Sequence, residues 1–330
     1  MDTNMAHCES FPRKAGIIGL KVPFQGRREN SVMSKKASNF QKKVMSLSYR
    51  GKEIFKPINT GRIDEHVACI REWVANIFFY TKNGVTIMID AGYNYDRLRE
   101  KMRWLDIDPA KIQHILITHQ DTDHVGAVET DSDLMFKDAT LYIGEVENRY
   151  LTGEVRRKVL FGWYRLPLVK IDNRKILLED GDIFNIGDIR IEAFLVPGHT
   201  WGHMVYLIDD AYLFTGDTIW FGVDGGYSFL NGLAEDNQLA LRSLAALEQK
   251  LRARKRSPII ITGHTGWTDS LDFAFAHRDQ VCNGFKKQEL HDPDAPYDAY
   301  DESDDTEEKA RNGSLPKANK GTRAHLTVSG

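Results

Sequence analysis

The sequence predicts a mixed α/β (α+β) domain over residues 51–288. Short apolar runs of strand length recur along this stretch, and segments with apolar residues at helical spacing lie between them. The composition agrees, because 42% hydrophobic and 10% aromatic residues are enough to form a sizeable core.

The elements follow from local patterns. Residues 69–80 and 85–90 are predicted as two strands joined by the turn Lys82-Asn83-Gly84, since Asn-Gly is a strong hairpin signal. Residues 95–105 and 235–251 have helical periodicity, and Asp108-Pro109 ends the region of the first helix. Further strands are expected at 112–118, 140–143, 175–179, 189–196, 204–208, 212–214 and 258–262.

Two charged segments flank this domain. Residues 11–50 contain ten Lys or Arg and one acid, so residues 1–50 are predicted as a basic arm, partly docked on the domain or flexible. Residues 289–308 contain ten acids and no Lys or Arg, so residues 289–330 are predicted as a disordered acidic tail. The four aromatic residues of the basic arm, Phe11, Phe24, Phe40 and Tyr49, do not alternate with its Lys and Arg residues, so a nucleic-acid partner is not favoured.

Composition also bears on the expected cellular location and on the classes of partner. The net charge is −3, so no global charge draws the chain to nucleic acid or to an anionic membrane. The three cysteines Cys8, Cys69 and Cys282 form no CxxC pair, so neither a disulfide framework nor a cysteine-built zinc site is expected. No apolar run has the length of a membrane span, and no secretory signal is visible. We therefore expect a cytoplasmic protein without a membrane partner.

The densest chemical signal is the run HQDTDH at residues 119–124, directly after the predicted strand 112–118. It holds His119, Asp121, Asp123 and His124. Divalent cations take this mixture of imidazole nitrogen and carboxylate oxygen. Asp123 could instead be a simple helix cap.

Three later positions strengthen the interpretation as a metal site. His199, Asp217 and His264 each follow an apolar strand, and each is preceded by a glycine that allows the chain to turn tightly. A single histidine after a strand is usually an ordinary loop residue, but three such positions together with the cluster indicate a shared site.

The sequence resembles the metallo-β-lactamase-fold superfamily. The resemblance implies a four-layer αββα sandwich with a two-metal site at the sheet edges, and Asp90 as a residue that orders the loop. It is carried by motifs in the family's order: IDAG at 89–92, residues 118–126, PGHTWGH at 197–203, TGD at 215–217 and TGH at 262–264.

The resemblance further implies a metal-dependent hydrolase in which two divalent ions hold a hydroxide between them. Asp217 would bridge the ions, and Asp123 could also accept or shuttle a proton, so both are predicted to act in catalysis. The implied ligands are His119, Asp121 and His199 for the first metal and Asp123, His124 and His264 for the second, with Asp217 shared.

One position departs from the family's pattern. The commonest motif is HxHxDH, whereas this chain has HxDxDH with Asp121 in place of the second histidine. Asp121 either ligates as a carboxylate or leaves the first metal weakly held. Zinc is the first expectation, and the harder carboxylate ligand makes iron or manganese an alternative.

The sequence indicates the substrate less clearly than it indicates the metal site. Residues 156–168 and 220–230 are aromatic, Gly-punctuated stretches that could line a pocket for an acyl group, with Trp201 as its floor, or could simply be core. The basic residues Arg156, Arg157, Lys158 and Arg165 could instead hold a phosphodiester. The predicted function is cleavage of an ester, lactone, thioester or phosphodiester of a small molecule. A non-haem diiron redox protein of the same fold, or a ligand-binding member without turnover, is the alternative, and the oligomeric state is not indicated.

Overall fold

The computed structural model describes five stretches of the chain. They are residues 57–72, 74–92, 95–129, 135–229 and 231–282. The predicted basic arm (1–50) and acidic tail (289–330) lie outside the described residues, so the domain boundaries stay predictions.

The first of two large sheets has seven strands in the order β1-β2-β3-β4-β5-β6-β9. Strands β1 to β4 pair antiparallel, while β4, β5, β6 and β9 pair parallel. The carboxyl ends of these four parallel strands therefore meet at one edge. The strands are β1 (Gly61–Arg62), β2 (Val67–Glu72), β3 (Ala75–Lys82), β4 (Val85–Ile89), β5 (His114–Leu116), β6 (Thr140–Gly144) and β9 (Lys175–Leu178).

The second sheet has six strands in the order β10-β11-β12-β13-β16-β17. All of its pairs are antiparallel except the parallel pair β13–β16, whose carboxyl ends lie side by side. The strands are β10 (Ile183–Ile186), β11 (Ile189–Leu195), β12 (Met204–Ile208), β13 (Tyr212–Phe214), β16 (Ile259–Thr262) and β17 (Gly266–Thr268).

Shorter elements complete the described part of the chain. A three-stranded sheet has the order β14-β15-β18, and β7 and β8 form a separate two-stranded hairpin. These strands are β14 (Ile219–Gly222), β15 (Gly225–Ser228), β18 (His277–Val281), β7 (Lys158–Val159) and β8 (Tyr164–Arg165). The helices are α2 (Tyr95–Trp104), η2 (Pro109–Lys111), α3 (Thr122–Val125), η3 (Gly126–Val128), α4 (Glu145–Leu151), η4 (Gly216–Thr218), α5 (Asn237–Arg252) and α6 (Leu271–Ala274).

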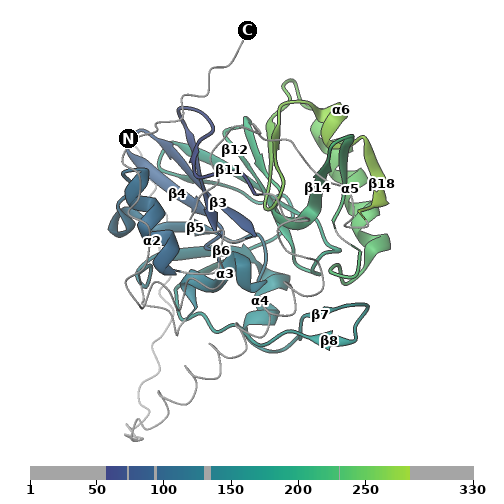
Figure 1. Cartoon of the computed structure of the whole chain (residues 1–330), viewed down its shortest axis with the longest axis horizontal. Helices are drawn as coiled ribbons and strands as arrows, with labels where there is room; N and C mark the ends of the chain where they lie inside the picture. The colour runs from purple at the N-terminus through teal and green to yellow at the C-terminus, as the bar shows by residue number, and fades with distance from the viewer. Residues whose placement is uncertain (1–56, 73, 93–94, 130–134, 230, 283–330) are drawn as a thin grey trace, which may run out of the picture.

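The core shows how these elements stack. In β3, Phe79 packs in a cluster with Leu98 and Met102 of α2, whereas its neighbour Phe78 faces the cluster between the two sheets. This alternation is the period-2 pattern of a strand buried on both faces. On the far side of the second sheet, Leu247 of α5 packs in a third cluster. The order helix, sheet, sheet, helix is the predicted αββα sandwich, and Figure 1 shows α2 and α5 on opposite sides of the strands.

Two strand predictions have different outcomes. The predicted hairpin at Asn83-Gly84 is confirmed, with φ of 50° and 79° at these residues and Lys82 opposite Val85. The prediction of one strand over residues 69–80 is wrong, because β2 and β3 pair antiparallel with Glu72 opposite Ala75. The reversal between them contains no Gly, Pro, Asn or Asp, so the sequence carried no turn signal there.

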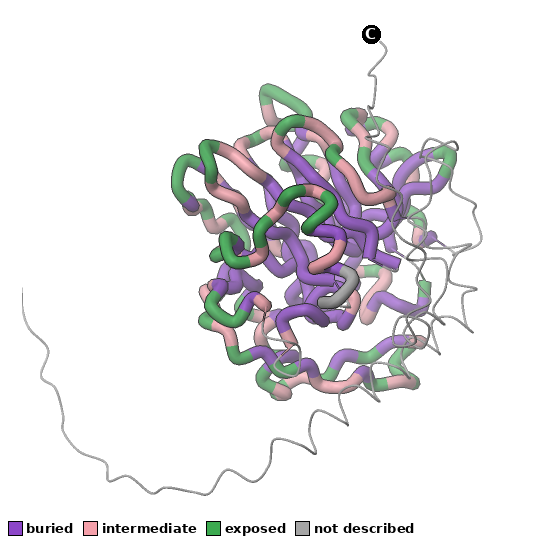
Figure 2. The backbone as a smooth tube through the Cα atoms, turned by 60° about the vertical axis from the view of Figure 1, so that its left-hand side comes forward, coloured by how far each residue is buried: buried purple, intermediate pink, exposed green. Residues whose placement is uncertain are grey.

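Burial follows the layers. Figure 2 shows the buried stretches gathered along the strands in the middle of the molecule, with exposed residues in the connecting loops. None of the helices in the described part of the chain is long and apolar enough to cross a membrane.

Candidate metal centre

All seven residues predicted as metal ligands are brought together at the strand-end edge of the sandwich. His119 to His124 follow β5, His199 follows β11, and His264 follows β16. Every one of the seven is buried except Asp123, whose side chain is 14% exposed. The seven residues therefore lie at strand ends, as the sequence pattern indicated, and their role as metal ligands stays a prediction.

A first group consists of His119, His199 and Asp217. The Nε2 atoms of His119 and His199 lie 3.7 and 3.4 Å from Oδ2 of Asp217. Ligands placed about 2.1 Å from a zinc ion at tetrahedral corners lie about 3.4 Å from one another. The three side chains thus have the spacing that a divalent ion requires.

A second group consists of Asp123, His124 and His264. The Nε2 atoms of the two histidines are 3.3 Å apart, and they lie 3.8 and 3.6 Å from Oδ2 of Asp123. This spacing also suits a small divalent ion.

Asp217 faces both groups. Its Oδ1 lies 3.2 Å from Nε2 of His124 and 3.1 Å from Nε2 of His264, in the second group. Its Oδ2 is the oxygen nearest the two histidines of the first group, and it also lies 3.2 Å from Nε2 of His264. The carboxylate sits in η4, directly after Gly216, whose φ is +48°. A Cβ atom at Gly216 would lie 2.6 Å from Oγ1 of Thr118, so only glycine allows this tight approach.

Asp121 lies at the rim of the first group. Its Oδ2 is 3.2 Å from Nε2 of His199 and 3.7 Å from Nε2 of His119. The same carboxylate accepts two hydrogen bonds from Arg157, which donates from Nε to Oδ1 over 2.9 Å and from Nη2 to Oδ2 over 3.0 Å. Burial acts to raise the pKa of Asp121, but the Arg157 guanidinium and the neighbouring histidines hold it well below its usual value.

Three of the four histidines predicted as ligands are oriented by contacts of their Nδ1 atoms, whereas Nδ1 of His199 is buried without a partner among the described residues. Nδ1 of His124 lies 2.7 Å from Oδ2 of Asp90, and Nδ1 of His119 lies 3.0 Å from Oγ1 of Thr118. Nδ1 of His264 contacts the carbonyl oxygen of Val74. Acceptors at Nδ1 place the proton there and leave Nε2 free to bind a metal.

Orphaned polar atoms show that these residues fit a metal. Nε2 of His119 and Oδ1 of Asp217 are fully buried, and neither has a hydrogen-bond partner among the described residues. Burial holds the pKa of His119 well below its usual value, which favours the neutral imidazole that a metal requires. Buried polar atoms without partners are costly, and a cation in each group would account for them, one beside Nε2 of His119 and one beside Oδ1 of Asp217.

Two supporting residues were not singled out by the sequence. Glu147 is fully buried in α4, where it accepts the backbone N–H of Gln120 over 2.8 Å and the hydroxyl of Thr200 over 2.6 Å. Burial raises the pKa of Glu147 to about 8. His203 stacks on His119, and its Nε2 accepts the backbone N–H of Asp217 over 3.0 Å. His203 lies in the PGHTWGH motif, which was its only signal in the sequence.

An aromatic wall lies beside the histidines. The Phe229 ring is 4.7 Å from His199 and 5.6 Å from His264, and Trp220 stacks at 6.2 Å from His264. Both aromatic residues come from the predicted stretch 220–230. Trp201 is 45% exposed, so it is not the buried floor that the sequence suggested.

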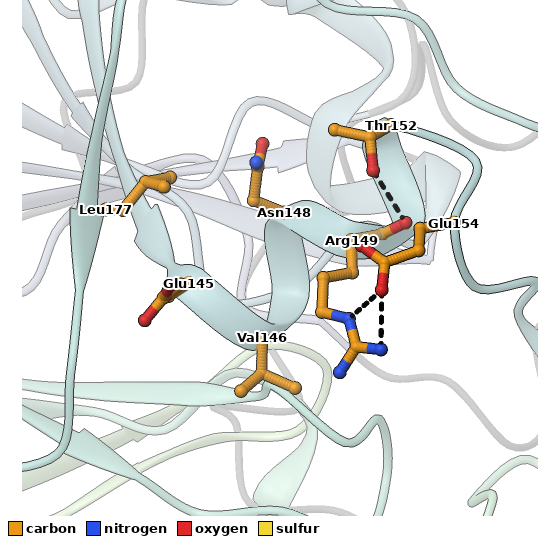
Figure 3. A pocket seen from close by; sticks show the side chains of 7 residues that line it. All are labelled: Glu145, Val146, Asn148, Arg149, Thr152, Glu154 and Leu177. Carbon is orange, nitrogen blue, oxygen red and sulfur yellow. Dashed lines mark hydrogen bonds and ion pairs between the residues drawn. The ribbon is translucent and has the colours of Figure 1, made fainter.

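A separate pocket of about 330 Å³ lies along α4. Figure 3 shows that Arg149 and Glu154 pair at its side and that none of the predicted ligands lines it. Five of its seven lining residues are polar or charged. The lining residues are Glu145, Val146, Asn148, Arg149, Thr152, Glu154 and Leu177.

An αββα sandwich with histidines and aspartates gathered at its strand ends defines a class of metal-dependent hydrolases. The sequence profile of the metallo-beta-lactamase superfamily matches residues 70–264, so the chain belongs to this superfamily. A solved B3 metallo-beta-lactamase with an active-site glutamic acid has the same fold, with a TM-score of 0.50 and 18% identity, and the match covers 70% of this chain and 90% of that one.

Curated relatives with hydrolase names are similar over part of their length. A probable polyketide biosynthesis zinc-dependent hydrolase of Bacillus velezensis is 32% identical over 40% of this chain and 49% of that protein. A hydroxyacylglutathione hydrolase of Shewanella halifaxensis is 37% identical over 42% of this chain and 45% of that protein. The chain thus matches about half the length of these relatives. A probable metallo-hydrolase of Bacillus subtilis is 26% identical over 64% of this chain and 93% of that protein. These relatives support metal-dependent hydrolysis in general.

Proposed function

We propose that the chain is a hydrolase with a binuclear metal centre. The observation that carries this proposal is the position of the Asp217 carboxylate, which lies between two groups of ligand atoms and contacts histidines of both. A carboxylate between two groups of this kind would hold a pair of cations together. The proposed ligands are His119, Asp121 and His199 for the first metal and Asp123, His124 and His264 for the second, with Asp217 shared.

A pair of divalent cations supplies Lewis acidity toward a substrate oxygen and lowers the pKa of water. Zinc is the proposed metal because histidine and aspartate suit it, and iron or manganese stays an alternative because Asp121 adds a hard oxygen ligand.

Side chains of the protein hold the ligands in position and supply a group that can accept a proton. Asp217 fixes the two groups relative to each other, since its backbone N–H is held by His203. Asp123 is the most exposed of the proposed carboxylate ligands, and its Oδ2 is the oxygen nearest the histidines. Its Oδ1 is therefore the atom that we propose accepts and passes on a proton. Burial raises the pKa of Asp123, which agrees with a group able to hold a proton.

We propose a small acyl ester, lactone or thioester as the substrate. Phe229 and Trp220 pack against the histidines with only 2% and 1% of their surface exposed, so they form an apolar backing to the site rather than an open pocket wall. Similarity to hydroxyacylglutathione hydrolases adds support for a thioester. A phosphodiester is less favoured, because Arg157, one of the basic residues that could hold it, is already paired with Asp121.

We also propose a cytoplasmic location. Cys69 and Cys282 are buried thiols, and Sγ of Cys69 donates to the carbonyl oxygen of Asn59. Retained thiols suit a reducing compartment.

The test combines metal content with a substrate panel. Protein loaded with zinc, manganese or iron is assayed on an ester, a lactone, a thioester and a phosphodiester, beside Asp217→Ala and the control Asp224→Ala. We expect turnover of at least one acyl substrate, its loss with a chelator, and at least a hundredfold loss in Asp217→Ala alone. Metal-loaded protein that cleaves nothing on the panel, or an Asp217→Ala variant with full turnover, contradicts the proposal. Oxygen consumption by the iron form would favour a diiron redox protein instead.

A further inference from the structure

One cationic side chain enters the metal centre. Arg157 lies just before β7 and is only 2% exposed. Arginine is almost never fully buried unless its charge is paired, and its guanidinium stays protonated at any ordinary pH. A fixed positive charge inside a site that binds cations calls for a physical explanation.

The guanidinium is held firmly in place. Nε and Nη2 donate to the two oxygens of Asp121, and Nη1 donates to the carbonyl oxygen of Lys158 over 2.9 Å. Nη2 also donates to the carbonyl oxygen of Leu233 over 2.7 Å. With both hydrogens of Nη2 directed at oxygen atoms, this position is built into the fold rather than being one of several that a mobile side chain visits.

Of the two groups of ligands, the Arg157 guanidinium contacts only the first. Nη2 lies 3.0 Å from Oδ2 of Asp121 and 3.2 Å from Nε2 of His199, which are two of the atoms proposed to bind the first metal. In the described part of the chain, the ion pairs of Asp123 and His124 are with histidine and aspartate side chains, not with a guanidinium. The two metal positions therefore differ in charge.

A simple count gives the direction of the difference. Apart from the shared Asp217, the first group carries one carboxylate, Asp121, and one guanidinium, Arg157, for a net charge of 0. The second group carries the carboxylate of Asp123 and that of Asp90 on Nδ1 of His124, with no guanidinium among the described residues, for a net charge of −2. Since like charges repel, and more strongly in a buried site than in water, a cation binds the first group less tightly.

We propose that Arg157 makes the two metal positions unequal, so that the Asp123 position fills first and the Asp121 position fills only at higher metal concentration. The proposal rests on the proposed ligand set. In this arrangement Asp121 serves two partners, because the oxygen that faces His199 also accepts from Arg157. The metal content of the protein would then depend on the supply of metal, and the binuclear form would be the one present when metal is plentiful.

The test is a metal titration, which needs no substrate. Metal-free protein is titrated with Co²⁺ and with Zn²⁺ in competition with a chromophoric chelator, for the wild type, Arg157→Met and the matched control Arg165→Met on the exposed face of β8. We expect two wild-type steps whose dissociation constants differ at least tenfold. In Arg157→Met the weaker step should tighten at least tenfold while the tighter step stays within threefold, and Arg165→Met should match the wild type.

Other variants assign each step. Asp123→Asn should remove the tighter step, and Asp121→Asn should remove the weaker one. Should Arg157→Met fail to fold, Arg157→Gln, whose neutral amide reaches the position of Nε and can still donate to Asp121, gives the same comparison. Equal dissociation constants in the wild type, or a weaker step that loosens in the Arg157 variant, would overturn the inference. Protein that binds no metal in any form would overturn the proposed function instead, so the two failures are distinguishable.

Discussion

Asp90 offers the sharpest test of how the second metal position is prepared. It is 3% exposed, lies directly after β4, and accepts hydrogen bonds from the backbone N–H of Thr118 over 2.8 Å and from its hydroxyl over 2.9 Å. Its Oδ2 lies 2.7 Å from Nδ1 of His124. A carboxylate that only accepts requires the His124 proton to sit on Nδ1, which leaves Nε2 available to a metal.

The substitution Asp90→Asn keeps the shape of the side chain and replaces the oxygen that faces His124 by a nitrogen that donates. The amide oxygen can still accept from the Thr118 N–H, so the amide nitrogen then faces Nδ1 of His124. Two N–H donors cannot face each other, so the His124 proton moves to Nε2, where it blocks metal binding. Loss of such an outer partner costs about 10- to 100-fold in metal affinity, which equals about 1.4–2.7 kcal/mol.

The assay is zinc titration against a chromophoric chelator. We expect the tighter zinc step to weaken by about 10- to 100-fold. The matched control is Asp209→Asn, because Asp209 has a positive φ of 50°, close to the 57° of Asp90, and accepts hydrogen bonds from Tyr80 and Lys82. That variant should lose stability and keep its zinc affinity. A folded Asp90→Asn protein whose tighter step stays within twofold of the wild type would refute the reasoning.

Three further predictions concern the supporting residues. Burial raises the pKa of Glu147 from 4.5 to about 8, so the native protein keeps a proton that the unfolded chain releases. Its stability should fall as the pH rises from 4.5 to about 8, and Glu147→Gln should flatten this slope in denaturant unfolding of metal-free protein; equal slopes would contradict it. Gly202→Ala places a Cβ against the backbone of Glu147, which should lower the free energy of unfolding by about 1–3 kcal/mol in a thermal unfolding experiment. An unchanged melting temperature would contradict this prediction. His203→Phe removes the acceptor of the Asp217 N–H, so turnover should fall at least tenfold in a folded protein, and full activity would count against its role.

The layers and the strand-end residues could be predicted because both follow from local patterns. The alternation around Phe78 and Phe79 marks a strand buried on both faces, and glycine before His199, Asp217 and His264 marks tight turns after strands. The hairpin between β2 and β3 could not be predicted, since no residue at its turn has a preference for turns.

The partners of the site residues were also beyond the sequence. Arg157 lies 36 residues from Asp121, inside a run of basic residues that gives no sign of which one is buried. Glu147 sits in a short helix, and only the packing of that helix against the loops around Gln120 and Thr200 makes it a fully buried acid. Long-range pairing of this kind depends on the assembled fold rather than on local pattern.

The central claim is that one carboxylate, Asp217, lies between two metal positions. Its most direct test is anomalous scattering at the zinc absorption edge from crystals grown with excess zinc. We expect two peaks, one held by His119 and His199 and one held by His124 and His264, with Asp217 reaching both. No peak at the strand ends, or a single peak that Asp217 does not contact even with zinc in excess, would contradict the account.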